Sequence, residues 1–171
     1  EDSYCYIGQI NYALTEARDT VLTASTYCGP DAIFAAPGLN GDFVTMVELR
    51  VQHRWSEYFS QVLQCNMGWD TNTAVGTGSW YGLYTVGILH LSECLDVQGR
   101  ADWFKDVKGT RTGIDTDYAA VTLGINWHPT SFFEFRPEVR GDFADSPAFG
   151  NNNTPQEKSQ FTAGISALFK F

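Results

Sequence analysis

The sequence has no long apolar run. No stretch of its 171 residues approaches the roughly 18 consecutive apolar residues that a membrane-spanning helix requires. Any segment inside a membrane would have to be a strand of a β-barrel, the other structure that satisfies its own backbone in lipid. Basic residues are also scarce, because 11 Lys and Arg stand against 20 Asp and Glu and give a formal net charge of −9. This balance argues against nucleic acid as a partner, since nucleic acid is bound by basic surfaces.

Motifs of catalysis and cofactor binding are missing as well. The chain has no glycine-rich phosphate loop, no CxxC pair and no basic tract. Its three histidines, His53, His90 and His128, fall on separate expected strands or turns, without the spacing of a metal site. We interpret them as isolated residues near strand ends. We therefore predict no enzyme activity, no metal site and no cofactor.

Charged and apolar residues alternate strictly over 131–142. Every second position there is charged: Glu134, Arg136, Glu138, Arg140 and Asp142. The positions between them hold Phe133, Phe135, Pro137, Val139 and Gly141. Successive side chains of a strand point to opposite faces, so one face is charged and the other largely apolar, with a bulge or kink expected at the proline. The pattern recurs, and the chain ends on Phe161, Ile165, Phe169 and Phe171. This predicts a transmembrane antiparallel up-and-down β-barrel with its apolar face toward lipid.

The chain divides into nine strand-like segments within one expected domain, residues 1–171. They lie near 3–14, 20–28, 43–55, 58–69, 80–91, 95–106, 117–127, 131–142 and 160–171. Short and long connections alternate, as periplasmic turns and extracellular loops do. Nine is odd whereas bacterial single-chain barrels have even numbers, so either residues 1–18 lie outside an eight-stranded barrel or the chain belongs to a larger one. We favour the C-terminal part of a barrel of roughly 12 to 18 strands. The start, EDSYCYIGQI, is no signal peptide, which fits a mature or truncated chain.

Residues facing the interior follow from this alternation. The predicted pore-lining residues are Glu48, Arg50, Gln52, Arg54, Gln98, Arg100, Asp102, Glu134, Arg136, Glu138, Arg140, Asp142 and Lys170. Thr45 joins this set only if a bulge near Met46 corrects its spacing from Glu48. Segment 80–91 is apolar on both faces and cannot be oriented from its sequence.

Aromatic residues near the strand ends predict belts at the two membrane interfaces. The residues assigned to them are Trp55, Phe59, Trp69, Trp80, Trp103, Trp127, Phe133 and Phe171. The competing interpretation is a soluble β-sandwich whose core these rings close. That fold is disfavoured, because it would leave the row of charged side chains over 131–142 on one face of a continuous sheet.

Two cysteines are expected to form a disulfide. Counted from the turn around Glu16 and Ala17, Cys5 and Cys28 are nearly equidistant and would face each other. A directly opposed pair is within disulfide reach, and the export route is oxidising. Cys65 and Cys94 lie near opposite ends of their strands and are not expected to pair.

Three blocks carry a family resemblance: RADWFKD at 100–106, NWHP at 126–129 and RPEVRGD at 136–142. With the final QFTAGISALFKF they resemble the C-terminal half of the putative β-barrel porin type 2 family, clearly over about 95–171. The resemblance implies an outer-membrane porin from a longer chain, with no enzyme activity and no dedicated cofactor. It supplies no particular solute.

These observations predict a porin in the bacterial outer membrane, through which small hydrophilic solutes or ions diffuse passively. Its expected partners are outer-membrane lipid and those solutes, with a homotrimer as the assembly to test. The alternative is a non-conducting barrel that anchors or scaffolds an envelope assembly. Two further questions stay open. The inner charges either create a field across a channel or hold the wall together as salt bridges, and the loop 143–159 folds either inward or outward.

Overall fold

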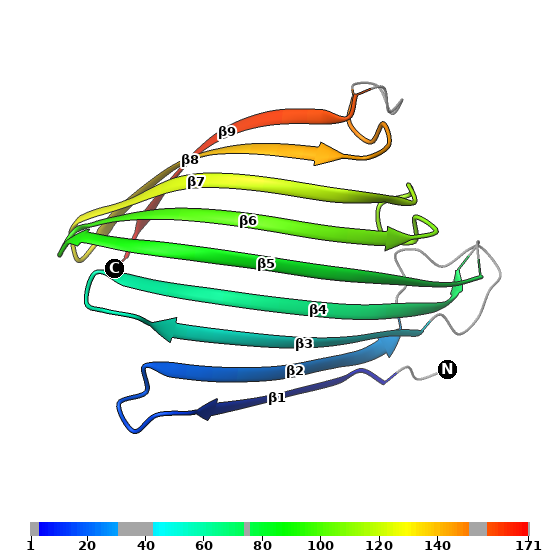
Figure 1. The fold of residues 1–171 in the computed structure, drawn as a ribbon, viewed down its shortest axis with the longest axis horizontal. Coiled ribbons are helices and arrows are strands. Elements are labelled where there is room, and N and C mark those ends of the chain that lie inside the picture. The colour runs from blue at the N-terminus through cyan, green and yellow to red at the C-terminus, as the bar shows by residue number, and fades with distance from the viewer. Residues whose placement is uncertain (1–3, 31–42, 74–75, 151–156, 171) are drawn as a thin grey trace.

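A computed structural model describes residues 4–30, 43–73, 76–150 and 157–170. Within these ranges the chain forms one sheet of nine antiparallel strands, each bonded to the next in sequence (Figure 1). The strands are β1 Tyr6–Ala13, β2 Thr20–Pro30, β3 Phe43–Arg54, β4 Phe59–Thr73, β5 Gly76–Ser92, β6 Leu95–Val107, β7 Thr116–Thr130, β8 Phe133–Ala144 and β9 Ser159–Phe169. No helix in this part of the chain could cross a membrane. The predicted all-β, up-and-down fold is confirmed.

All but one of the connections separate by length onto the two ends of the sheet (Figure 1). One end, here called the short-turn end, carries the tight turns, such as the one in which the Trp55 N–H donates to the Phe59 carbonyl at 3.0 Å. The opposite end carries the long connections and is called the long-loop end. The alternation predicted from the sequence holds for the other connections, but the long loop expected over 70–79 is wrong, because β4 continues to Thr73 and β5 begins at Gly76.

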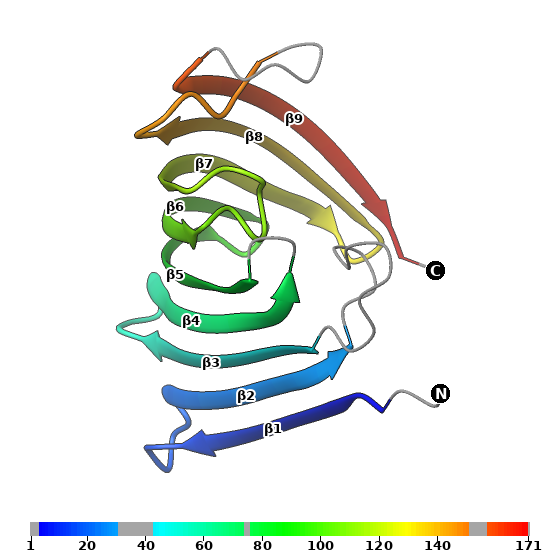
Figure 2. The same cartoon turned by 90° about the vertical axis from the view of Figure 1, so that its right-hand side faces the viewer.

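The two faces of the sheet differ in polarity. On one face large apolar side chains are widely exposed, such as Leu123 at 56% and Ile165 at 73%. On the opposite face even carboxylates are buried, such as those of Glu134 and Asp142. The sheet is curved like a trough (Figure 2). Side chains crowd together on a concave face and spread apart on a convex one, so the polar face is the concave one. We call it the inner face and the apolar convex face the outer face.

Strands β1 and β9 are the free edges of this sheet (Figures 1 and 2). Contacts between the described strands join only consecutive ones, so β1 does not pair with β9 and the sheet is open. All side chains of β1 are exposed, as expected for an edge without a further neighbour. An open, curved, up-and-down sheet of this kind is consistent with a section of a barrel.

The register settles two orientations that the sequence left open. In β5, Tyr84 pairs with Asp102 and Val86 with Arg100, so the even-numbered residues of β5 face inward. β3 pairs with both neighbours without a register shift. There is accordingly no bulge near its start, and Thr45 lies on the outer face.

The predicted disulfide between Cys5 and Cys28 is wrong. The residue opposite Cys28 is Tyr6, so Cys5 is displaced by one position. Adjacent residues of a strand point to opposite faces, and this offset separates the two sulfur atoms. Both thiols are free, and the Cys28 sulfur lies 3.4 Å from the hydroxyl oxygen of Thr45.

Candidate functional site: the polar inner face

The predicted pore-lining residues share the inner face of the sheet. Cross-strand pairing places Asp102 beside Ala120, and Ala120 beside Asp142. Arg100 and Arg140 occupy the next row toward the short-turn end, separated by one small residue of β7. The charged side chains of β6 and β8 thus lie on the same face of the sheet, and only the smaller inward side chains of β7 separate them.

Arginines on this face pair with carboxylates of their own strand. The Arg100 guanidinium lies 2.6 Å from the Asp102 carboxylate, and Arg140 lies 2.7 Å from Asp142. A longer contact of 3.9 Å joins Arg140 to Asp102 across the strands. The four side chains therefore alternate in sign. Their charge is balanced locally, and they are not sorted into an acidic wall facing a basic wall.

A second cluster of ion pairs lies at the short-turn end. Glu134 accepts two hydrogen bonds from Arg136, at 2.6 and 2.8 Å. Lys170, which follows β9, reaches the other oxygen of Glu134 at 3.2 Å. This contact places Lys170 on the inner face and ties it to β8.

Hydrogen bonds from neutral donors dominate the β3 side of the inner face. Glu48 accepts from the amide of Gln64 at 2.6 Å and from the hydroxyl of Ser25 at 3.3 Å. The Tyr84 hydroxyl donates to the Gln64 carbonyl oxygen at 2.5 Å. The Arg50 Nε is buried beside them without a hydrogen-bond partner among the described residues. The wall therefore changes from paired charges on β6 and β8 to a polar network with one less satisfied cation on β3.

The β6–β7 loop, residues 108–115, folds over the inner face at the long-loop end. Asp106, the last inward-facing residue of β6, is completely buried. Its carboxylate accepts from the backbone N–H of Arg111 at 3.0 Å and of Thr112 at 2.6 Å. It also accepts from the hydroxyls of Thr112 at 2.8 Å and Thr110 at 3.3 Å. One carboxylate thereby fixes the turn of this loop.

Arg111 anchors the tip of the same loop to the wall. Its guanidinium lies 4.7 Å from the ring centre of Trp80 and 4.0 Å from the carboxylate of Asp70, which is 1% exposed. The wall makes room with two glycines. A Cβ on Gly68 would lie 2.1 Å from Trp80, and a Cβ on Gly78 would lie 1.9 Å from the methyl group of the loop threonine, distances that no packed structure allows. The glycines of β4 and β5 therefore leave the space that the inward-folded loop needs.

The start of the β8–β9 loop also bends inward. The Ser146 N–H donates to the Thr116 hydroxyl at 3.0 Å, and the Phe149 ring packs edge-on against Tyr118 at 6.3 Å. Tyr118 in turn donates to the Thr112 hydroxyl at 2.9 Å, which links the two loops. The sequence did not decide between an inward and an outward fold for this loop. Its described first part, 145–150, lies inward, and together the two loops narrow the long-loop end of the inner face.

The family model described as putative beta-barrel porin-2, OmpL-like, matches residues 2–171. The chain belongs to this family. The match spans nearly the whole chain, beyond the region of about 95–171 in which the sequence blocks resemble the family. No curated protein and no solved structure matches the chain significantly.

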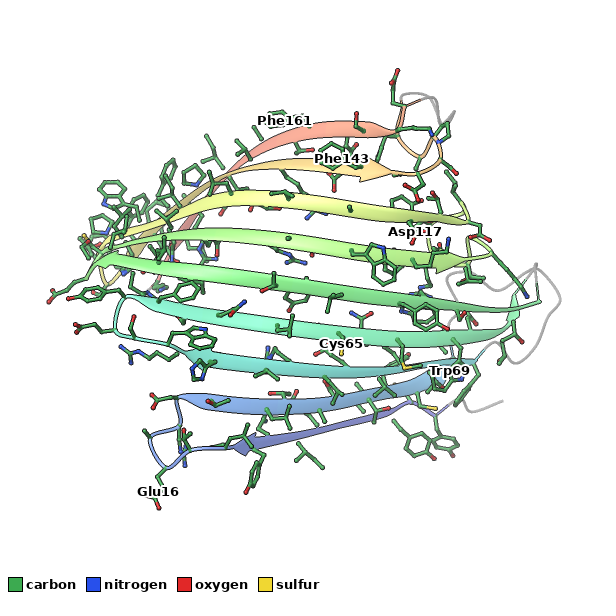
Figure 3. The ribbon with its side chains drawn as sticks, in the orientation of Figure 1. Glu16, Cys65, Trp69, Asp117, Phe143 and Phe161 are labelled. Carbon is green, nitrogen blue, oxygen red and sulfur yellow. The ribbon has the colours of Figure 1, made fainter. Side chains whose placement is uncertain are left out.

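Aromatic rings of this porin-family chain gather on the outer face at both ends of the strands. At the short-turn end Trp127 packs edge-on against Phe133 at 6.4 Å, and Phe133 contacts Phe169 at 5.2 Å. Trp69 lies at the long-loop end, and Phe143 and Phe161 project from neighbouring strands (Figure 3). The remaining outward rings of the predicted set are Trp55, Phe59 and Trp103. Phe171 lies outside the described residues.

Trp80 does not belong to this outer belt. It pairs with Asp106 and Gly68, faces inward and is only 5% exposed. The alternation could not reveal this, because 80–91 is apolar on both faces. Tyr81, the next residue, points outward in its place and is well exposed.

The histidines of this chain are not isolated. The Ser60 hydroxyl lies 2.7 Å from His90 Nε2, and His90 Nδ1 lies 2.8 Å from Asp96. This order of groups is that of a hydrolase triad. β4 and β5, however, are paired on both sides here, so their backbone N–H groups are used in the sheet and none is left to stabilise an oxyanion. We interpret these contacts as hydrogen bonds that join β4, β5 and β6 within the wall. The other two histidines also have partners: Thr20 for His53 and the Glu93 carbonyl for His128.

Proposed function

We propose that the protein forms a water-filled channel across the bacterial outer membrane, through which small hydrophilic solutes or ions diffuse passively without chemical conversion. The observation that carries this proposal is the division of one continuous sheet into a polar inner face and an exposed apolar outer face. Large exposed apolar surfaces are rare on soluble monomers, and here the surface extends over consecutive strands. Lipid is the environment that suits the outer face, and water suits the paired charges of the inner face.

Completion of the ring is part of the same proposal. In lipid, the N–H and C=O groups on the open edges of β1 and β9 cannot be left unpaired. Further strands beyond the nine described therefore close the barrel, which gives a ring larger than the eight-stranded barrels that side chains fill. That width favours a channel over the alternative of a filled, non-conducting anchor.

Planar-bilayer recording tests the channel directly. The purified full-length protein, folded in detergent, should give stable ohmic current steps when it inserts. Heat-modifiable migration on a gel confirms in parallel that the inserted sample is folded. Folded protein that inserts but carries no current would contradict the channel and leave the anchor.

The ion pairs of the inner face should control ion preference. Replacing Arg140 by glutamine leaves Asp142 without its cation and takes one positive charge from the wall. A unit charge about 8 Å away changes the energy of an ion in water by roughly 0.5 kcal/mol. The effect has opposite sign for a cation and for an anion, so we expect the cation-to-anion permeability ratio, measured as a reversal potential across a salt gradient at low ionic strength, to rise about fivefold.

Arg18 provides the matched control for that measurement. It is an exposed residue in the short turn between β1 and β2, away from the inner face. Arg18→Gln removes the same charge and should leave the reversal potential nearly unchanged. An equal shift in both variants would show that overall charge, and not the inner wall, sets the preference.

A further inference from the structure

A cavity of about 420 Å³ lies on the inner face where the two inward loops meet the wall. Gly82 and Ala120 form its floor, and small residues there leave the space open. Thr112 of the β6–β7 loop and Phe149 of the β8–β9 loop line its other side. Its volume falls in the range of about 300 to 1,000 Å³ that is usual for small-molecule sites. A solute passing the narrowed end would enter this space.

The polar lining of the cavity is rich in hydrogen-bonding groups but nearly neutral. Arg100, Asp102, Arg140 and Asp142 all line it, and they pair with one another at 2.6 to 3.9 Å. An anion would have to compete with carboxylates already bound to both guanidinium groups. A hydroxyl group can instead donate to a carboxylate and accept from a guanidinium without separating the pair.

Aromatic rings supply the complementary apolar surface. Tyr118 stands between Phe104, at 6.1 Å, and Phe149, at 6.3 Å. Tyr84 lies beneath the guanidinium of Arg100, 4.4 Å from its centre. Rings of this kind offer flat apolar faces to the C–H surface of a ligand while their hydroxyls remain available for hydrogen bonds. A purely apolar ligand would bury the charged pairs without bonding to them, which is unfavourable.

We propose that this cavity binds a neutral sugar of one or two rings as it passes through the channel. The inference rests on the proposed channel function and adds a solute class to it. Sugar hydroxyls bond to the alternating Arg and Asp side chains, and a ring face packs on Tyr118 and Phe149. The site thereby concentrates sugars at the end of the path that the two loops narrow.

Binding of maltose to the folded full-length protein tests the inference. Titration calorimetry in detergent micelles measures the affinity, and current recordings with maltose in the bath measure interruptions of the open channel. We expect millimolar binding, and an affinity about tenfold weaker in Tyr118→Ala because one ring face is lost. Phe149→Ala removes a ring from a loop, so it should weaken binding similarly without affecting the folding of the sheet.

Tyr58→Ala is the matched control, because this tyrosine is exposed at the short-turn end. It should bind maltose as the wild type does, and sodium maltobionate, a charged ligand of similar size, should bind more weakly than maltose. Open channels without maltose binding would overturn the sugar site and leave the channel intact. Stronger binding of maltobionate, or equal losses in Tyr58→Ala and Tyr118→Ala, would also overturn it. Maltose binding by a folded protein that never conducts would support the sugar site and contradict the proposed channel function.

Discussion

Replacing Asp106 by alanine should release the β6–β7 loop from the inner wall. The carboxylate accepts hydrogen bonds from two backbone N–H groups and two hydroxyls of this loop. Hydrogen bonds to a charged group are worth about 1.5 to 3 kcal/mol each, so losing the two backbone bonds alone costs about 3 kcal/mol or more. The open population of the loop should rise at least about a hundredfold.

Two measurements detect the released loop. Trypsin should cut the folded protein after Arg111 at least about tenfold faster, because the loop no longer holds that residue against Trp80. The single-channel conductance should become larger and noisier, since the narrowed end of the path widens and fluctuates. Both changes share one cause, so they should appear together.

Asp115 supplies the control within the same loop. Its carboxylate is 54% exposed and lies 3.5 Å from the ammonium group of Lys105. Asp115→Ala removes the same charge, yet it should leave both the cleavage rate and the conductance close to the wild type, because exposed ion pairs contribute little. Wild-type cleavage and conductance in Asp106→Ala would show that the buried carboxylate does not hold the loop.

The features of the fold that depend on side-chain alternation along a strand, or on the length of a connection, could be predicted from the sequence. In β8 the alternation of charge and apolar residues identifies both faces unaided, because successive side chains must point apart. Alternating connection lengths likewise separate the two ends of the sheet, with the exception of the short β4–β5 connection. Each of these signals is local to one or two segments, so no knowledge of the neighbouring strands is needed.

The missed features depend on strands that are distant in sequence. β5 is apolar on both sides, and its orientation follows only from pairing Val86 with Arg100. The error with Cys5 and Cys28 came from a turn whose length differs by one residue from the one assumed, which moves a side chain to the other face.

The inward fold of the β6–β7 loop is a second feature that local patterns could not reveal. Asp106 reads as the end of a strand, and Arg111 reads as an exposed loop residue. Their burial depends on space left by Gly68 and Gly78 on other strands. The one available signal was Gly68, a glycine within an expected strand, because such glycines often mark a close approach. Gly78 fell in the loop expected between 69 and 80 and carried no such signal.

An arginine placed on the outer face should destabilise the protein in a membrane, whereas an arginine one position away should not. Ile165 lies near the middle of β9 and is 73% exposed on the outer face. Arg at the bilayer midplane of a barrel costs about 2 to 4 kcal/mol. We expect Ile165→Arg to lower the free energy of unfolding by that amount, measured by urea titration of the full-length protein in phosphatidylcholine vesicles.

Gly164 is the matched control, because it faces inward and pairs with Glu138. A Cβ there would meet Glu138 at 3.7 Å, an ordinary contact, so Gly164→Arg should fit and gain an ionic partner. The two variants place the same new charge on adjacent residues of one strand but on opposite faces of the sheet. On a soluble sheet an exposed substitution usually changes stability by less than about 0.5 kcal/mol. Equal and small effects in both variants would therefore contradict a lipid-facing outer surface, whereas a loss confined to Ile165→Arg would require one.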